Sequence, residues 1–450
     1  MFDRDVQRIK NLDLVVALAA FAGLCIAVLT RAPQLLEPDD LAYRASIVAL
    51  SHGHLTLSTA QYQALSRQVG QIAQWTQLSD GRWISEKNPG YPFFALPFQL
   101  LHVLRLTPLF YGALGCAGLY AGARRWLGRL GGAWAVVLYC SSGAALVFAW
   151  RATMPTFTDA SLIAAGLGGL LWTLLAADAP ARRRTVVGLL SFLALEGATF
   201  IRYTDIVALL VAVVAVPLVA RRAGISRRAL AWWGASVVAF GALVAGFDDL
   251  VYGGVLKTGY AAGEIEFGLG AVLPNLREMP RQLVSTMPLL VLALASLVWI
   301  GLRLARSRST DRRRDAAVAA GLAGVWLGVY ALYLAYTWTV RAGAGSGNAV
   351  HVIRFYVPAL GALALLAAWV VHRLPRWLPV ATLAAVVAIG GFSYPGLTAQ
   401  GLGPGLRGGG PAGGAPFRGA PGGVEPPGAG RGSFSSPGGA PSGTRPPRAP

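Results

Sequence analysis

Charged residues are scarce in this sequence. Asp, Glu, Lys and Arg make up 13% of the 450 residues, whereas about a quarter is usual for a soluble globular protein. Apolar residues reach 55% and gather in uncharged blocks such as 14–29, 206–220 and 355–371. A helix needs about 20 apolar residues to cross the ~30 Å hydrocarbon core of a bilayer. The composition excludes a soluble globular fold and predicts an integral membrane protein with many spans.

Cysteine is also rare. Cys25, Cys116 and Cys140 all fall in predicted spans and lack the spacing of a disulfide framework or a metal site. We interpret them as small core residues. No small-residue cleavage site follows the first apolar block, and similar blocks recur later, so this block is predicted to be a span and not a signal peptide.

The net charge of +19 does not indicate a nucleic-acid partner, because the basic residues form neither a stripe nor an arm. Most lie in short clusters between apolar blocks. The clusters fall within 124–129, 182–184, 221–228, 303–314 and 373–376. Short basic connections lie on the cytoplasmic side of a membrane. Their alternation predicts a cytoplasmic N-terminus and a bundle of about eleven transmembrane helices. Segment 91–106 is expected to be a re-entrant or interfacial helix and 107–121 the second span.

The opposite connections are then external. The first of them, residues 31–90, is long and is expected to carry interfacial helices. In it, Leu41, Ala45, Val48 and Ala49 share one face of a predicted amphipathic helix. Residues 396–450 are rich in Gly, Pro and Ser, and we expect an external, disordered tail. The predicted architecture is an all-α membrane domain over residues 1–395 followed by this tail.

Acidic residues and one of only three lysines gather in the external connections. Asp39 and Asp40 begin the predicted amphipathic helix, Lys87 lies near the end of the same connection, and Asp159 begins a later span. Each carboxylate has an alternative role as a helix N-cap, and Lys87 as a snorkelling lysine. Together they suit chemistry on an anionic lipid, with a carboxylate as base toward a hydroxyl and cations that stabilise a departing phosphate.

Two further charged residues have predicted partners. Arg202, in the external turn FIRYTD, is expected to pair with an acidic group or a phosphate. Glu196, inside the fifth predicted span, is expected to be the most buried carboxylate and to pair with a basic or polar group in the bundle.

The order of the motifs resembles the GT-C class of polytopic glycosyltransferases, in particular the protein O-mannosyltransferase and aminoarabinose-transferase-like members (glycosyltransferase family 39-like). The likeness covers about 12–395. It rests on EPDDLAYRAS, EKNPGYPFF, TFTDASL, FIRYTD, DDLVYGGVLKTGY and HVIRFYVPALGALALLAA, in this order. Two departures are an Asp-Asp pair where many members have Asp-Glu, and a low-complexity tail where many have a folded external domain.

The resemblance implies an inverting enzyme that takes a sugar from a polyprenyl-phosphate donor on the external face. It implies Asp39 as the catalytic base, with Asp40 able to exchange roles, and Asp159 as a residue that positions acceptor or base. The implied donor-phosphate residues are Lys87, Arg202, Lys257 and Arg354, and the implied substrate-positioning residues are Glu86, Tyr91, Tyr260 and His351. The acceptor is a glycan, a lipid or a protein, and the transferred group a hexosyl or pentosyl unit.

Two other functions are open at this stage: a transporter or flippase of a lipid-linked glycan, and a non-catalytic protein of cell-envelope assembly. The preference for arginine over lysine, with abundant Ala and Gly, indicates a GC-rich bacterial genome and hence a plasma (inner) membrane protein. No cofactor is predicted. Binding of a divalent metal remains an open alternative, although the sequence contains no cluster of ligands that requires one.

Overall fold

The computed structural model describes residues 11–32, 38–70, 72, 74–255, 257–260, 265–306, 309–343, 352–375 and 377–399. His351, most of the N-terminal segment and the tail therefore lie outside the described residues. Eight described helices are long and apolar enough to cross a membrane. The chain is a multi-pass membrane protein, as the composition predicts.

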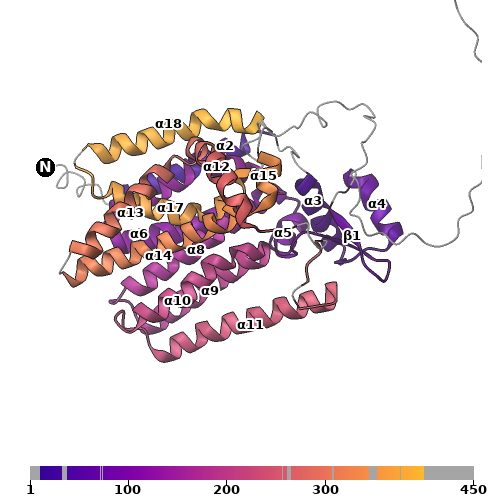
Figure 1. Ribbon diagram of the computed structural model, residues 1–450, viewed down its shortest axis with the longest axis horizontal. Helices are drawn as coiled ribbons and strands as arrows, with labels where there is room; N and C mark the ends of the chain where they lie inside the picture. The colour runs from indigo at the N-terminus through magenta and orange to yellow at the C-terminus, as the bar shows by residue number, and fades with distance from the viewer. Residues whose placement is uncertain are drawn as a thin grey trace, which may run out of the picture. The chain divides into compact units, whose positions relative to one another are not determined.

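Two of these helices coincide with the apolar blocks 14–29 and 206–220, and the long helices pack side by side in Figure 1. The eight are α2 (Leu12–Leu29), α8 (Thr156–Leu175), α9 (Ala181–Ile201), α10 (Ile206–Ala220, with η2, Tyr203–Asp205, before it), α11 (Arg227–Tyr252), α13 (Leu289–Arg306), α14 (Thr310–Leu334) and α18 (Leu378–Ala399). Proline or glycine interrupts few of them, so each keeps its backbone hydrogen bonds internal, as hydrocarbon requires.

Helix α6 (Thr107–Cys140) is a hairpin and not one straight rod. Gly128 breaks it with φ 81° and ψ −176°, a conformation that side chains other than glycine rarely adopt. The Sγ atoms of Cys116 and Cys140 lie 3.4 Å apart although 24 residues separate them, a span of about 36 Å in a straight helix. The two arms therefore run antiparallel, and the break lies inside the basic cluster that was predicted to separate the second and third spans.

The second arm of α6 continues into α7 (Gly143–Trp150), and a shorter apolar helix, α17 (Leu360–Val371), follows η4 (Val357–Ala359). The first arm packs tightly on α8 through small residues. A Cβ atom on Gly118 would lie 2.7 Å from Ala165 Cα, and one on Gly122 would lie 2.4 Å from Gly168 O. Such close approach of backbones is typical of helix pairs in membranes.

The first long connection folds into α3 (Pro38–Ser51), α4 (Thr59–Val69), the antiparallel strands β1 (Trp75–Gln77) and β2 (Trp83–Ser85), and α5 (Gly90–Leu100). In Figure 1, α3, α4 and β1 lie at one end of the long helices, and the C-terminal end of α13 and the start of α14 lie at the other end. The two strands were not predicted from the sequence. The connection between α11 and α13 carries η3 (Leu269–Ala271) and α12 (Val272–Thr286). Two further short helices are α15 (Thr337–Gly343), which follows α14, and η1 (Leu104–Leu106), which precedes α6.

Helix α3 corrects the prediction of a helix that lies on the surface with one apolar face. Ala45 and Ala49 of the predicted face are buried in a small cluster with Leu57 and Trp75. The opposite face is buried as well, because Tyr43 and Ile47 join the main core of the bundle. Helix α3 is therefore packed between two hydrophobic clusters, which holds its first turn firmly against the membrane helices.

Helix α5 has 11 residues and contains Pro97, so it is about 16 Å long and too short to cross a bilayer. This agrees with the prediction of a re-entrant or interfacial helix, although it ends earlier than expected. Gly90 starts the helix against the end of α9, where a Cβ atom would lie 2.4 Å from the carbonyl of Phe200. The close approach requires glycine at this position.

Candidate active site

The two aspartates in the first turn of α3 face different partners. Adjacent residues on a helix point about 100° apart, so Asp39 and Asp40 cannot serve the same neighbour. Asp40 accepts a hydrogen bond from Arg151 Nη2 at 2.5 Å and another from Thr153 Oγ1 at 2.9 Å. The Asp40 and Arg151 side chains are fully buried. This pair joins the start of α3 to the end of α7.

Asp39 lies between two cations. Its Oδ1 atom is 3.1 Å from Lys87 Nζ, and its Oδ2 atom accepts from Arg354 Nη1 at 2.6 Å. The Asp39 side chain is 12% exposed, whereas that of Asp40 is not exposed at all. Of the two carboxylates, Asp39 is therefore the one that a bound molecule can reach.

Lys87 follows β2 and is held from several sides. Its Nζ donates to the hydroxyl of Tyr260 at 3.1 Å, and its backbone N–H donates to Ser85 Oγ at 3.1 Å. The side chain is 8% exposed, so the alternative of a lysine that snorkels to the headgroups does not describe it. A Cβ atom on Gly259 would lie 2.6 Å from Glu86 Cα. The segment with Tyr260 thus packs directly on the backbone beside Lys87.

Arg202 connects this cluster to Asp159. Its Nε atom lies 3.3 Å from Asp159 Oδ2, and Nη1 donates to the backbone oxygen of Arg354 at 3.1 Å. Asp159, in the first turn of α8, has no exposed surface. The guanidinium of Arg354 lies over the rings of Trp338 and Phe355, where cation–π attraction adds to the ion pairs.

Two tyrosines support the cluster from the side of α3. The buried Tyr91 hydroxyl donates to the backbone oxygen of Ala152, and its ring packs edge-on against Tyr43. Burial, with the charge of Tyr260 as a lesser cause, raises the pKa of Tyr43 above its ordinary value, so its hydroxyl stays protonated. The predicted substrate-positioning residue Tyr91 thus supports α3.

The structure brings six predicted site residues into one cluster, which we call the Asp39 cluster. Its members are Asp39, Lys87, Asp159, Arg202, Tyr260 and Arg354. The side chain of Lys257, three residues before Tyr260, is exposed, and its backbone N–H donates to the backbone oxygen of Gly254. Glu86 borders the cluster through its backbone, and His351 lies outside the described residues.

Sequence reasoning missed the residues that hold the cluster together. Arg151 carried a signal, since it is a lone arginine at the end of an apolar block, just before the predicted external connection at 154–159. Asp205 is 1% exposed and lies beside Asp159 and Arg202. Glu196 accepts from Ser236 Oγ at 2.9 Å, so its predicted polar partner is present. Glu196 is 3% exposed, and Asp40 and Asp159 are more deeply buried, so the prediction that it is the most buried carboxylate is wrong.

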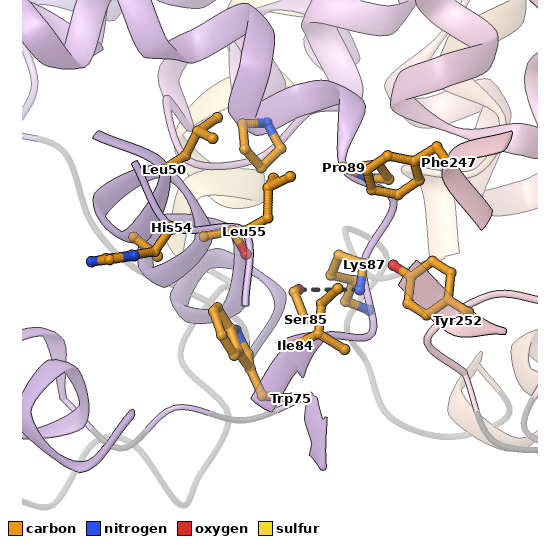
Figure 2. Close-up of a pocket in the computed structure, with 13 residues that line it drawn as sticks. Leu50, His54, Leu55, Trp75, Ile84, Ser85, Lys87, Pro89, Phe247 and Tyr252 are labelled. Carbon is orange, nitrogen blue, oxygen red and sulfur yellow. Dashed lines mark hydrogen bonds between the residues drawn. The ribbon is translucent and has the colours of Figure 1, made fainter. Parts of the chain in front are cut away.

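A mainly apolar groove leads to Lys87 from the surface. Figure 2 shows Lys87 with Pro89, Phe247 and Tyr252 on one side and Trp75 and Leu55 on the other. The enclosed volume is about 30 Å³, enough for a water molecule but far below the 300 Å³ or more of a typical ligand pocket. A substrate larger than this volume enters only where the groove is wider than in this structure.

Within the described residues, no group of three or more His, Cys, Asp or Glu side chains is arranged to hold a metal ion. The Asp39 cluster places an accessible carboxylate, Asp39, next to the cations of Lys87 and Arg354, and all three side chains are largely buried. Such a site can accept a proton and stabilise negative charge on a phosphate.

No protein-family model matches the chain, and no curated protein matches it in sequence. Solved structures of two proteins are among those that resemble it in fold. ArnT from Cupriavidus metallidurans, bound to undecaprenyl phosphate, is 15% identical with a TM-score of 0.50 over 84% of this chain and 62% of ArnT. Archaeal oligosaccharyltransferase AglB from Archaeoglobus fulgidus, in complex with an inhibitory peptide and a dolichol-phosphate, is 12% identical with a TM-score of 0.50 over 87% of this chain and 56% of AglB.

Both proteins are GT-C glycosyltransferases. The chain has the GT-C fold. The GT-C resemblance of the motifs is thus confirmed at the level of fold. The chain spans only about three fifths of the length of these GT-C structures.

Proposed function

We propose that the chain is an inverting glycosyltransferase that moves a sugar from a polyprenyl-phosphate donor to a hydroxyl of a glycan, lipid or protein acceptor. The observation that carries this proposal is the position of Asp39, held between Lys87 and Arg354 on a GT-C fold. The ArnT structure holds undecaprenyl phosphate, and the AglB structure holds a dolichol-phosphate. A donor of the same chemical class suits the cations of the Asp39 cluster.

The proposed reaction is a single displacement. Asp39 accepts the proton of the acceptor hydroxyl as its oxygen attacks the anomeric carbon of the donor. The bond from that carbon to the phosphate oxygen breaks on the opposite face, which inverts the anomeric centre. Negative charge grows on the leaving polyprenyl phosphate, and Lys87 and Arg354 stabilise it. Without donor the two cations pair with Asp39, and a bound phosphate shares them.

The neighbouring carboxylates have positioning roles in this proposal. Asp40 joins α3 to Arg151 and so orients Asp39. Asp159 holds Arg202, which in turn donates to the backbone of Arg354. The groove beside Lys87 is apolar enough for the prenyl chain of the donor, which requires a wider groove than in this structure.

We also propose that the Asp39 cluster is external. In this proposal, the eight long helices, the two arms of α6 and the shorter α17 serve as eleven spans. Arg354 precedes α17 and Arg373 follows it, so the Asp39 cluster and the basic connections lie at opposite ends of this helix. Basic connections favour the cytoplasm. The cell of origin is proposed to be bacterial and the membrane its plasma membrane.

The test is sugar release from a panel of polyprenyl-phosphate sugars by the full-length protein in lipid nanodiscs. Asp39→Asn is expected to lower the rate ~10²-fold or more, as for loss of a general base. Asp80→Asn is the matched control, because Asp80 lies in the same external connection and pairs with the exposed Arg82. If the wild type consumes no donor in the panel but moves a lipid-linked glycan across the bilayer, the flippase alternative replaces the enzyme.

A further inference from the structure

A second polar site lies at the end of the bundle away from the Asp39 cluster. Here the last turns of α13 and the first turn of α14 line an open cavity of about 260 Å³. It is lined by Trp299, Leu302, Arg303, Arg306 and Arg312. We call it the α13–α14 cavity. The proposed reaction uses none of these residues.

A single carboxylate fixes the geometry of this cavity. Asp315 Oδ1 accepts from the indole N–H of Trp126 at 2.8 Å and of Trp369 at 2.9 Å. Its Oδ2 accepts from Arg303 at 2.9 Å and from Arg373 at 2.6 Å. These contacts tie α6, α13, α14 and the end of α17 to one point. The cavity wall is therefore preorganised, since its helices cannot shift without breaking charge-assisted hydrogen bonds.

The cavity has an excess of positive charge. Asp315 neutralises part of the charge of Arg303, whereas Arg306 and Arg312 have no acidic partner among the residues that the structure describes. Guanidinium groups gathered around one space repel each other unless an anion lies between them. Arginine is also the side chain whose planar fork matches phosphate oxygens.

The apolar side of the cavity continues along the membrane-facing surface of α13. Val291, Leu294, Val298 and Leu302 follow one another at helical spacing and are all exposed. This stripe leads from the first turn of α13 to the arginines at its end. A molecule that fits both parts has a hydrocarbon chain and an anionic head.

We propose that the α13–α14 cavity binds an anionic phospholipid, with its phosphate among Arg303, Arg306 and Arg312 and an acyl chain along α13. A phospholipid headgroup and a free phosphate ion would both bind the arginines through the phosphate group. The apolar stripe along α13 favours the lipid over the free ion. The site does not depend on the proposed enzyme activity. In the proposed topology, the α13–α14 cavity faces the cytoplasmic leaflet of the membrane.

Native mass spectrometry of the full-length protein in detergent tests this site. The protein is titrated with phosphatidylglycerol and, in parallel, with phosphatidylcholine. We expect one phosphatidylglycerol to bind at least 10-fold more tightly than phosphatidylcholine. The double variant Arg306→Gln/Arg312→Gln is expected to lose this preference, with binding about 10- to 30-fold weaker. The matched control is Arg221→Gln/Arg222→Gln, which removes the same charge from another basic connection.

Three outcomes would overturn the proposal. Equal binding of the two lipids by wild type means that the cavity selects no anionic head. Equal loss in both double variants means that net charge, and not the cavity, attracts the lipid. Displacement of phosphatidylglycerol by inorganic phosphate at the same concentration means that the site takes free phosphate. A melting curve without added lipid shows whether the variants fold. If the double variant does not fold, the single variant Arg312→Gln takes its place.

Discussion

Asparagine substitutions at Asp39 and at Asp40 are expected to do different kinds of damage, although the residues are adjacent. Asp40→Asn removes the negative charge that pairs with Arg151 at 2.5 Å, and both side chains are fully buried. Asp39→Asn removes a charge that is partly accessible and faces Lys87 and Arg354. The first change should therefore act on folding, and the second on catalysis.

The size of each effect follows from burial. Breaking a buried ion pair by removing one partner costs about 3–5 kcal/mol, which is a large part of the 5–15 kcal/mol that stabilises a typical protein. A charge-assisted hydrogen bond at a partly exposed site contributes about 1.5–3 kcal/mol, and asparagine at position 39 retains a hydrogen-bond acceptor. Replacing both members of the buried pair, as Asp40→Leu/Arg151→Met, is expected to recover much of the loss, because no lone charge is left inside.

The assay combines the thermal midpoint in detergent with sugar release per folded molecule. We expect Asp39→Asn to melt earlier than wild type, but by less than Asp40→Asn, and to lose ~10²-fold or more in rate per folded molecule. Asp40→Asn should melt much earlier, with the folded fraction still active. The reasoning is refuted if Asp40→Asn melts like wild type but is inactive while Asp39→Asn retains activity. That result would exchange the two roles.

Other changes test the site and the hairpin of α6. Lys87→Met should lower kcat/KM about 10- to 100-fold by removing a charge near the departing phosphate, and unchanged kinetics would exclude Lys87 from donor binding. Gly128→Ala should destabilise the fold by about 1–3 kcal/mol, because the backbone conformation there is almost confined to glycine. Gly234→Ala, also in open space but inside a regular helix, is its control and should be neutral or slightly stabilising. Mild oxidation should join Cys116 to Cys140, whose Sγ atoms lie 3.4 Å apart; a straight α6 would prevent that crosslink.

Some features were predictable because they depend on local composition. An uncharged block of about 20 residues has few alternatives to a membrane helix, and the blocks 14–29 and 206–220 appear as helices α2 and α10 with nearly these bounds. The break in α6 was predicted as a basic connection. The GT-C resemblance followed from short motifs in a fixed order, which requires no knowledge of how they meet.

Other features were not predictable because they depend on partners far away in the chain. Two faces of α3 are buried, since the connection brings its own small cluster against the helix, and a pattern over 37–54 cannot reveal that cover. The depth of Glu196 relative to Asp40 and Asp159 was misjudged for the same reason. A carboxylate in a predicted external connection is expected to contact water. Tertiary packing instead buries Asp40 and Asp159 completely.

The sequence by itself determined that this chain crosses a membrane many times, and it supplied the acidic and basic residues from which a site can be built. Only the tertiary structure decided that Asp39 meets Arg354, 315 residues later, and that Asp40 turns to Arg151. The physical reason is the direction of side chains on a helix. Neighbouring positions diverge by about 100°, so the packing of α3 against the bundle selects which carboxylate faces the cations and which is buried.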